Sequence, residues 1–542
     1  MGLRSKYKAF NEALHSLYGR DMLTLTKEKR LFDFNDTLME DAAQLIYKNG
    51  GFDLAQMDTP QAKAVMEETL RIMDTAIGSG LPNEVPGTIR YALENNAFMF
   101  SGFKTFHTLR EVGLSMLTDK GRIKPFNDFL EDVKRINALY NHNYLYAEYN
   151  HALGAAQMAA KWHDFEQDGD RYNLQYRTAG DDKVREEHAI LNGTTLPPSD
   201  PFWNMFLPPN GWNCRCTAVQ VRKNKYPASD PELAMKRGQN CTEGAKKSIF
   251  RYNPGKSLKL FPPKHPYFKV PAEAKQAIGQ ITQEAIREKR IGTLREQLPD
   301  TLTDSEKDAI AANNYELEQA LDIMAGKPMT VEQADQQSAN PKHALKYLPD
   351  PNGNYRDKTG ARYRLNPNYR TSDRQYSINC ATCAPTYALR LKGFDIKAKG
   401  RIPGSGSLND SVAYGRSFEM WQNTDGSAAQ PTLTYNWMMS KGYKSMTPKR
   451  YKEYFEESCK EVGVYILTIG WKGGGGHATV LQRFADGSLK YIEPQEYDSI
   501  QGAKRELDEL CINGASKPHP SRGLLRVDNK MFDVAFLPLF DK

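Results

Sequence analysis

No stretch of the 542-residue chain approaches the roughly 20 consecutive apolar residues that a membrane-spanning helix needs. The first residues, Met1 to Tyr7, lead into a polar amphipathic pattern and lack the apolar core of a secretory signal. We therefore expect no Sec signal peptide and no membrane partner. The mean hydropathy is negative and the hydrophobic fraction is 39%, which indicates a soluble protein that can still build packed cores.

Cysteine and net charge are also low for a chain of this length. The seven cysteines are an odd number and include two close pairs, Cys214/Cys216 and Cys380/Cys383. This pattern excludes a disulfide framework and predicts synthesis in a reducing cytoplasm. The 73 Lys and Arg residues against 66 Asp and Glu leave a net charge of +7, which gives no indication of nucleic-acid binding.

The length exceeds that of one ordinary domain, and the residue pattern changes along the chain. The N-terminal part has helical periodicity, with predicted helices over residues 6–17, 36–48, 59–77, 89–96 and 127–163. Residues 171–222 contain strand-like alternation and a Pro-rich loop, and Pro-containing connectors follow. We predict an α+β multidomain protein with a mainly helical domain over 1–250, a Pro-rich linker with helices over 251–327 and an α+β domain over 328–542.

The core motifs of the N-terminal domain follow one another in a fixed order. They are Asp181–His188 in a short predicted helix, Leu191-Asn-Gly193, Pro208-Pro-Asn-Gly211 and Cys214-Arg-Cys216. This ordered set resembles the phage Mu F-like head-morphogenesis module of minor head proteins, and the Tyr- and Ala-rich segment Tyr144–Trp162 is also similar to that family. The resemblance implies a phage head domain near the portal, packaged in the virion, with portal and capsid proteins as partners.

The same motifs bring together three residues that can bind a metal ion, His188, Cys214 and Cys216. Thiolates and imidazoles are the usual ligands of zinc. However, Cys-x-Cys is an unusual zinc spacing, and the sequence offers no identifiable fourth ligand. A packed structural cluster is therefore favoured over a metal site, and no cofactor is predicted.

A second pair of cysteines, Cys380 and Cys383, stands at the start of a predicted helix that ends before Gly393. Pro385 fits the first turn, where its missing N–H has no cost. A thiol at a helix N-terminus is favoured as the thiolate, which is the nucleophile of thiol hydrolases. Cys383 is closer to Pro385 and therefore to the helix proper, so both cysteines are candidates for the nucleophile.

A base for this thiol is expected at His477, which follows four consecutive glycines and begins a predicted strand. An Asp486-Gly487 turn connects that strand to another, which ends at Glu493. Pairing through this turn brings the His477 and Glu493 side chains within reach of one another. A thiol on a helix, with a base and an orienting group on an adjacent sheet, is the arrangement of cysteine proteases.

The order of Asn379-Cys380, Gly476-His477-Ala478 and Tyr491-Ile-Glu-Pro-Gln495 resembles the papain-fold toxin domains of bacterial and phage polymorphic toxins, over roughly residues 328–520. Some members of that group are protein-glutamine deamidases. The resemblance implies that Cys380 is the nucleophile, that His477 is the base and that Glu493 orients the imidazole. The family usually has aspartate at the position of Glu493, so Gln495 is the alternative orienting group.

Together, these patterns predict a phage or prophage minor head protein that carries a cysteine-dependent amidohydrolase effector. A protein-glutamine deamidase toxin is the preferred activity, with a cysteine protease toxin or a head-maturation protease as alternatives. A purely structural capsid- or portal-associated protein is the competing hypothesis. The enzymatic prediction implies action in the bacterial cytoplasm on a target protein with a reactive glutamine, and an immunity protein as a further partner.

Overall fold

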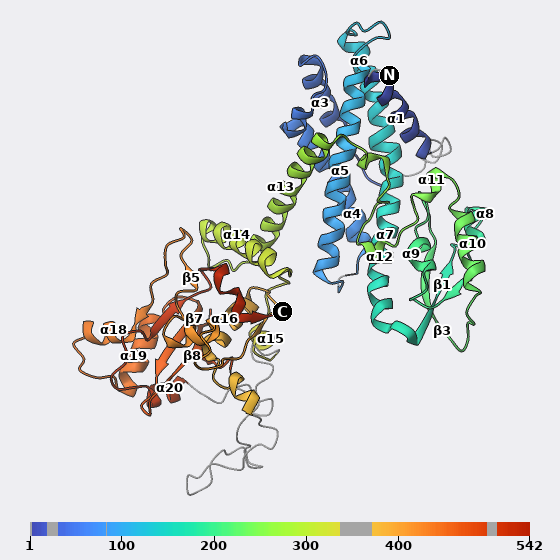
Figure 1. Cartoon of the computed structure of the whole chain (residues 1–542). Helices are drawn as coiled ribbons and strands as arrows, with labels where there is room; N and C mark the ends of the chain where they lie inside the picture. Colours follow the sequence, from blue (N-terminus) through green and yellow to red (C-terminus); the bar gives the residue numbers. More distant parts are fainter. Residues whose placement is uncertain (1–2, 19–30, 83, 337–370, 496–506) are drawn as a thin grey trace. The chain divides into compact units, whose positions relative to one another are not determined.

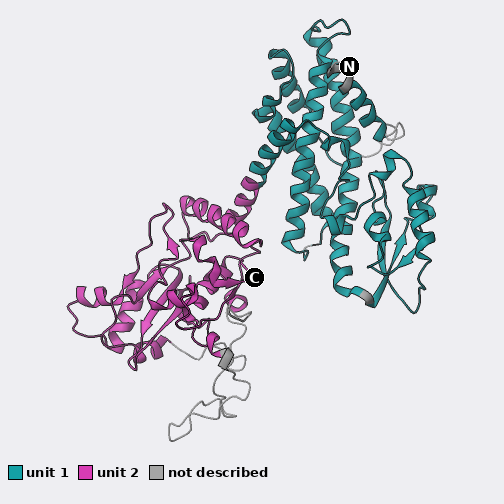
Figure 2. Ribbon diagram, viewed as in Figure 1, with its two compact units in different colours: residues 1–286 teal, residues 287–542 magenta. Residues whose placement is uncertain are grey.

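The computed structural model describes residues 3–18, 31–82, 84–336, 371–495 and 507–542. The chain divides into two compact units, Met1–Ile286 and Arg287–Lys542 (Figure 2). The boundary lies inside one helix, α13 (Ala272–Glu296). Among the described residues, none of the helices combines the length and the hydropathy that a membrane span requires.

Long helices form most of unit 1. They are α1 (Leu3–Tyr18), α3 (Asp36–Lys48), α4 (Pro60–Gly80), α5 (Gly87–Ser115), α6 (Phe126–Asn137) and α7 (Leu145–Asp168). Helix α4 packs against both α5 and α7 (Figure 1). A Cβ atom at Gly80 would lie 2.8 Å from the carbonyl oxygen of Leu153, so glycine allows this close approach. The single helix predicted over 127–163 is interrupted by a π-helical turn, Ala138–Tyr144.

A small antiparallel sheet follows α7, with strand order β2-β1-β3. Its strands are β1 (Tyr172–Arg177), β2 (Thr195–Leu196) and β3 (Thr217–Arg222). The short helices in this part of the chain are α8 (Glu186–Ala189), α9 (Phe202–Phe206), α10 (Pro231–Cys241), α11 (Ala245–Ser248) and α12 (Pro254–Ser257), the last of which packs against α7. The sheet shares an apolar core with α7, α9 and α10 that includes Trp162, Leu174 and Trp203. Three 3₁₀ turns complete the described part of unit 1, at Leu54–Asp58, Gly169–Arg171 and Pro266–Phe268.

The segment 251–327, predicted as a linker, packs into both units. In unit 1, the Phe261 ring stacks on Phe100 with centroids 3.6 Å apart, and its backbone N–H donates to Asn96. In unit 2, α14 (Asp304–Leu321) begins with a capping box in which Thr303 and Glu306 satisfy each other's backbone N–H groups. The structure therefore differs from the sequence prediction, because the segment supplies core residues to each unit.

Unit 2 is built around a five-stranded antiparallel sheet in the order β6-β10-β7-β8-β9. Its strands are β6 (Thr432–Leu433), β7 (Gly463–Gly470), β8 (Gly476–Arg483), β9 (Leu489–Ile492) and β10 (Gly523–Arg526). The helices are α15 (Val331–Gln336), α16 (Cys380–Leu391), α17 (Leu408–Ser411), α18 (Thr434–Ser440), α19 (Pro448–Ser458) and α20 (Leu507–Asn513). Two further strand pairs join β4 (Lys397–Ala398) to β12 (Phe540–Asp541) and β5 (Trp421–Gln422) to β11 (Met531–Phe532). The 3₁₀ turns are Thr371–Tyr376, Val412–Tyr414 and Val534–Leu539.

The two faces of this sheet bury separate apolar clusters, because successive side chains of a strand point to opposite faces. Ala478 and Val480 lie in the cluster that includes the alanines of α16. Leu467 and Leu481 lie in the other cluster, together with aromatic residues of α18 and α19. The chain is thus a mixed helix-and-strand protein, as predicted, and α16 is held against the strand that follows the glycine run.

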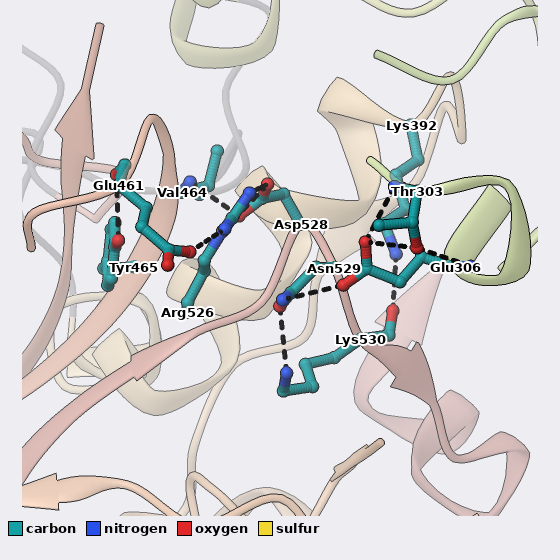
Figure 3. A network of polar contacts seen from close by, with 10 residues as sticks. All are labelled: Thr303, Glu306, Lys392, Glu461, Val464, Tyr465, Arg526, Asp528, Asn529 and Lys530. Atoms are coloured by element: carbon teal, nitrogen blue, oxygen red, sulfur yellow. Dashed lines mark hydrogen bonds and ion pairs between the residues drawn. The ribbon is translucent and has the colours of Figure 1, made fainter. Parts of the chain in front are cut away.

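A polar network on unit 2 connects segments that are far apart in the sequence (Figure 3). Asp528 pairs with Arg526 and accepts a hydrogen bond from the backbone N–H of Val464 at 2.9 Å. Asn529 donates to Glu306, and the Lys392 ammonium group donates to the carbonyl of Lys530 at 2.9 Å. The network therefore joins α14 and the end of α16 to the chain that follows β10.

Candidate thiol active site

Helix α16 begins at Cys380, which is its first residue and is partly exposed. Cys383 lies one turn further on, is fully buried and packs against Ala398. Pro385 lies in the second turn rather than in the first turn as predicted, because the helix begins at Cys380. Proline cannot donate to the carbonyl four residues earlier, but the helix continues to Leu391 through packing of its buried residues against the sheet.

His477 is the second residue of β8, opposite Ile469 of β7 in the antiparallel ladder. The turn before it requires positive φ at Gly474 and Gly475, 89° and 78°, which glycine adopts without strain. The His477 side chain is only 6% exposed. The glycine run therefore acts as a tight turn that positions a buried imidazole at the start of a strand.

Glu493 directly follows β9, and its carboxylate lies 2.8 Å from Nε2 of His477. The same carboxylate accepts a hydrogen bond from the hydroxyl of Tyr491 and one from the backbone N–H of Gln495 at 3.1 Å. Glu493 is 2% exposed, so these donors replace water as its partners. The carboxylate is fixed in position and holds the imidazole through one ring nitrogen.

Gln495, the alternative orienting group, lies against the start of α16. Its side-chain amide donates to Oδ1 of Asn379 at 3.4 Å, and Asn379 in turn donates to the carbonyl of Lys399 at 3.0 Å. The structure thus places Glu493, and not Gln495, in hydrogen-bond contact with Nε2 of the imidazole. Gln495 instead links the end of β9 to the residue before Cys380.

Cys380 and His477 lie close enough that each changes the pKa of the other and favours its charged form. Burial opposes ionisation of Cys380, but the hydrogen bond and the charge of His477 hold the pKa of this thiol below its ordinary value. Burial by itself would lower the pKa of His477, but the charge of Glu493, followed by the hydrogen bond to Cys380, raises that pKa to about 10. The arrangement favours a thiolate beside an imidazolium ion.

The remaining thiols of unit 2 lack this activation. Burial raises the pKa of Cys383 well above the ordinary range, and the nearby charge of Cys380 adds to the effect. Burial also raises the pKa of Cys459 to about 12 and that of Cys511 to about 11. Of the two cysteines that the sequence leaves open as nucleophiles, Cys380 has the partners that a reactive thiolate requires.

Two aromatic residues at this site were not predicted from the sequence. Tyr491 donates to Glu493, and the Trp471 ring stacks on the His477 imidazole with centroids 5.9 Å apart. Tyr491 stands two residues before Glu493, and this period of two places both side chains on one face of the strand. That spacing could have identified Tyr491, whereas nothing local in the sequence identifies Trp471.

The other predicted group, His188, Cys214 and Cys216, also comes together, in unit 1. Nδ1 of His188 lies 3.5 Å from Sγ of Cys214 and 3.6 Å from Sγ of Cys216. The hydrogen bond between the thiols lowers the pKa of Cys214, while the same bond and burial raise the pKa of Cys216. Of the described residues, these three form a group whose possible metal ligands lie within 4.8 Å of one another.

Residues 124–219 match the family model described as "Phage Mu protein F like protein". The chain is 30% identical over 162 residues to the "Mu-like prophage FluMu F protein" of Haemophilus influenzae, covering 28% of this chain and 37% of that protein. It is 32% identical over 87 residues to the "Putative capsid assembly protein F" of Escherichia phage Mu, covering 15% of this chain and 17% of that protein. The matches thus span much less than two thirds of either relative, and no solved structure matches the chain.

Proposed function

We propose that this chain, whose residues 124–219 are phage Mu F-like, is a phage or prophage head protein that carries a thiol amidohydrolase in unit 2. The head role is supported by the similarity to a capsid assembly protein. The family match lies entirely within unit 1, together with His188, Cys214 and Cys216. Portal and capsid proteins are the partners that this role implies, and the virion is its location.

The single observation that supports an enzyme is the buried His477–Glu493 pair at 2.8 Å, whose imidazole lowers the pKa of the Cys380 thiol. Because Nε2 of His477 contacts Glu493, the nitrogen left for the thiol is Nδ1. An inert buried cysteine has no need of a base held by a buried carboxylate. Burying that carboxylate and the imidazole without such a pairing would be unfavourable by several kcal/mol.

Amide hydrolysis at this site begins with attack of the Cys380 thiolate on the carbonyl carbon of an amide. At the start of α16 the backbone N–H groups of Thr382 and Cys383 donate to the carbonyl of Asn379, so the N–H groups of Cys380 and Ala381 are the proposed donors to the negative oxygen that develops. The His477 imidazolium then gives its proton to the leaving nitrogen, which departs as ammonia or an amine while a thioester remains. Neutral His477 next takes a proton from water, whose oxygen displaces the sulfur and releases the acid.

A glutamine side chain of a bacterial protein is the proposed substrate, on the strength of the resemblance to deamidating papain-fold toxins. In that reaction the leaving group is ammonia and the product is glutamate. Peptide-bond cleavage follows the same steps with an amine as the leaving group. In a bacterium that carries this gene, we expect an immunity protein that binds unit 2 and covers Cys380.

The test is inducible expression of the full chain in bacteria beside the Cys380→Ala and His477→Ala variants. Growth inhibition by the parent alone, with glutamine-to-glutamate changes in the host proteome, is the expected result. The two substitutions combined should have no larger effect than either alone, because members of one catalytic unit are non-additive. New peptide termini would identify a protease instead. Equal growth and unchanged host proteins with all variants would refute the enzymatic proposal.

A further inference from the structure

The contacts of His188 have a geometry that hydrogen bonding alone does not explain. Both cysteine sulfurs lie at nearly equal distances, 3.5 and 3.6 Å, from the same nitrogen, Nδ1. A ring nitrogen carries either one N–H or one lone pair, so it makes one well-directed hydrogen bond. Two sulfurs converging on one nitrogen instead resemble three ligands that surround a common centre.

The distances agree with tetrahedral zinc. With Zn–S of about 2.3 Å, Zn–N of about 2.0 Å and tetrahedral angles, a sulfur and a nitrogen bound to one zinc ion are separated by roughly 3.5 Å. The observed Sγ–Nδ1 distances of 3.5 and 3.6 Å therefore fit two edges of that coordination sphere. Two thiolates and an imidazole are ligands that select zinc over harder cations such as magnesium and calcium.

The local backbone explains how the unusual Cys-x-Cys spacing can supply two ligands. Arg215, between the cysteines, points outward and pairs with Asp181, its Nη2 lying 2.6 Å from the carboxylate. The chain then runs directly into β3, and alternate residues of such an extended segment share one side. Both sulfurs therefore face His188 of α8, while the intervening arginine faces solvent.

The neighbouring loop packs closely against Arg185 and touches the imidazole of His188. A Cβ atom at Gly211 would lie 3.1 Å from Nη1 of Arg185 and 3.9 Å from Nε2 of His188. Arg185 donates to the carbonyl of Trp212, and Asn213 adopts a left-handed φ of 56° directly before Cys214. The loop thus passes over the imidazole, and the backbone turns at Asn213, directly before Cys214.

We propose that His188, Cys214 and Cys216 form a three-ligand zinc site with water in the fourth position. The site is independent of the thiol chemistry of unit 2. Its role is to join α8, which carries His188, to the segment with Cys214 and Cys216 that leads into β3. Among the described residues, no other His, Cys, Asp or Glu belongs to the ligand group. Cys241 lies in the same apolar core but outside that group, which makes it a matched control thiol.

The experiment measures zinc in the full chain, purified without chelators, by elemental mass spectrometry. About one zinc ion per chain is expected for the parent protein and for Cys241→Ser. His188→Ala, Cys214→Ser and Cys216→Ser should each weaken binding by more than the roughly 10- to 100-fold that follows loss of an outer-shell partner. Equal zinc loss from Cys241→Ser would contradict the three-ligand assignment.

Cobalt substitution tests the parent protein without any variant that could fail to fold. The expected result is thiolate-to-cobalt absorption that appears with one equivalent of Co²⁺ and disappears when zinc is added. A protein that binds neither ion, or whose mass shows a Cys214–Cys216 disulfide in freshly reduced samples, would overturn the proposal. The three residues would then be a packed polar cluster.

Discussion

Replacing Glu493 by glutamine tests how the thiol is activated. The carboxylate contacts His477 and accepts from Tyr491 and from the N–H of Gln495. Its negative charge is the foremost influence that raises the His477 pKa to about 10 from 6.5. A neutral amide of the same shape removes that charge, so on the order of 2 kcal/mol of imidazolium stabilisation is lost.

As a consequence, a smaller fraction of Cys380 is present as the thiolate at a given pH. The midpoint of its pH–rate profile for iodoacetamide labelling should move to higher pH, and below that midpoint the rate should fall about 10- to 30-fold. The two cysteines of α16 lie on the same tryptic peptide, so the measurement uses a Cys383→Ala background. Glu461→Gln, which removes an exposed carboxylate paired with Arg526, is the matched control and should leave the profile unchanged.

The same substitution should also lower stability. One amide oxygen can replace only one of the two carboxylate oxygens, so at least one of the three donors loses its acceptor. An unsatisfied buried donor costs about 1–3 kcal/mol, which a thermal unfolding scan detects. An unchanged labelling profile in a folded Glu493→Gln variant would refute the role assigned to this carboxylate.

Further predictions concern the same constellation. Cys380→Ala should abolish rapid labelling and toxicity, whereas Cys383→Ala should retain both. Growth and labelling assays check this prediction. The reverse result would make Cys383, one turn further along α16, the nucleophile. Tyr491→Phe removes one donor to Glu493 and should slow labelling about 3- to 10-fold, since a hydrogen bond to a charged group contributes roughly 1 kcal/mol or more. The raised His477 pKa contributes stability that is complete below about pH 6.5 and is lost as pH rises toward 10, so His477→Gln should flatten the fall in melting temperature over that range.

Local patterns were enough to predict the part of the site that lies on one hairpin. The Asp486-Gly487 turn fixes the register of β8 and β9, with Val480 opposite Ile492. Continued by one pair, that register places Glu493 opposite Thr479, one strand period from His477, and the structure gives the contact between His477 and Glu493 as 2.8 Å. The cysteine, proline and glycine signals also predicted a helix that begins near the two cysteines, but the proline signal was wrong about the first turn, because α16 begins at Cys380 and Pro385 lies in its second turn.

Only the tertiary structure distinguished between residues that look alike in sequence. Cys380 and Cys383 are one helical turn apart, but packing buries Cys383 against Ala398 and leaves Cys380 beside His477, which is 97 positions along the chain. Glu493 and Gln495 also differ by one strand period, and only the approach of α16 sends Gln495 to Asn379.

The sequence alone determined the phage Mu F-like segment and the order of the thiol, imidazole and carboxylate along the chain, because both depend on local residue types and spacing. Only the folded chain decided the place of residues 251–327 and the convergence of His188 with Cys214 and Cys216. The physical reason is that burial and ligand distances depend on contacts between segments that are remote in sequence. Those contacts exist only after the helices and sheets have packed.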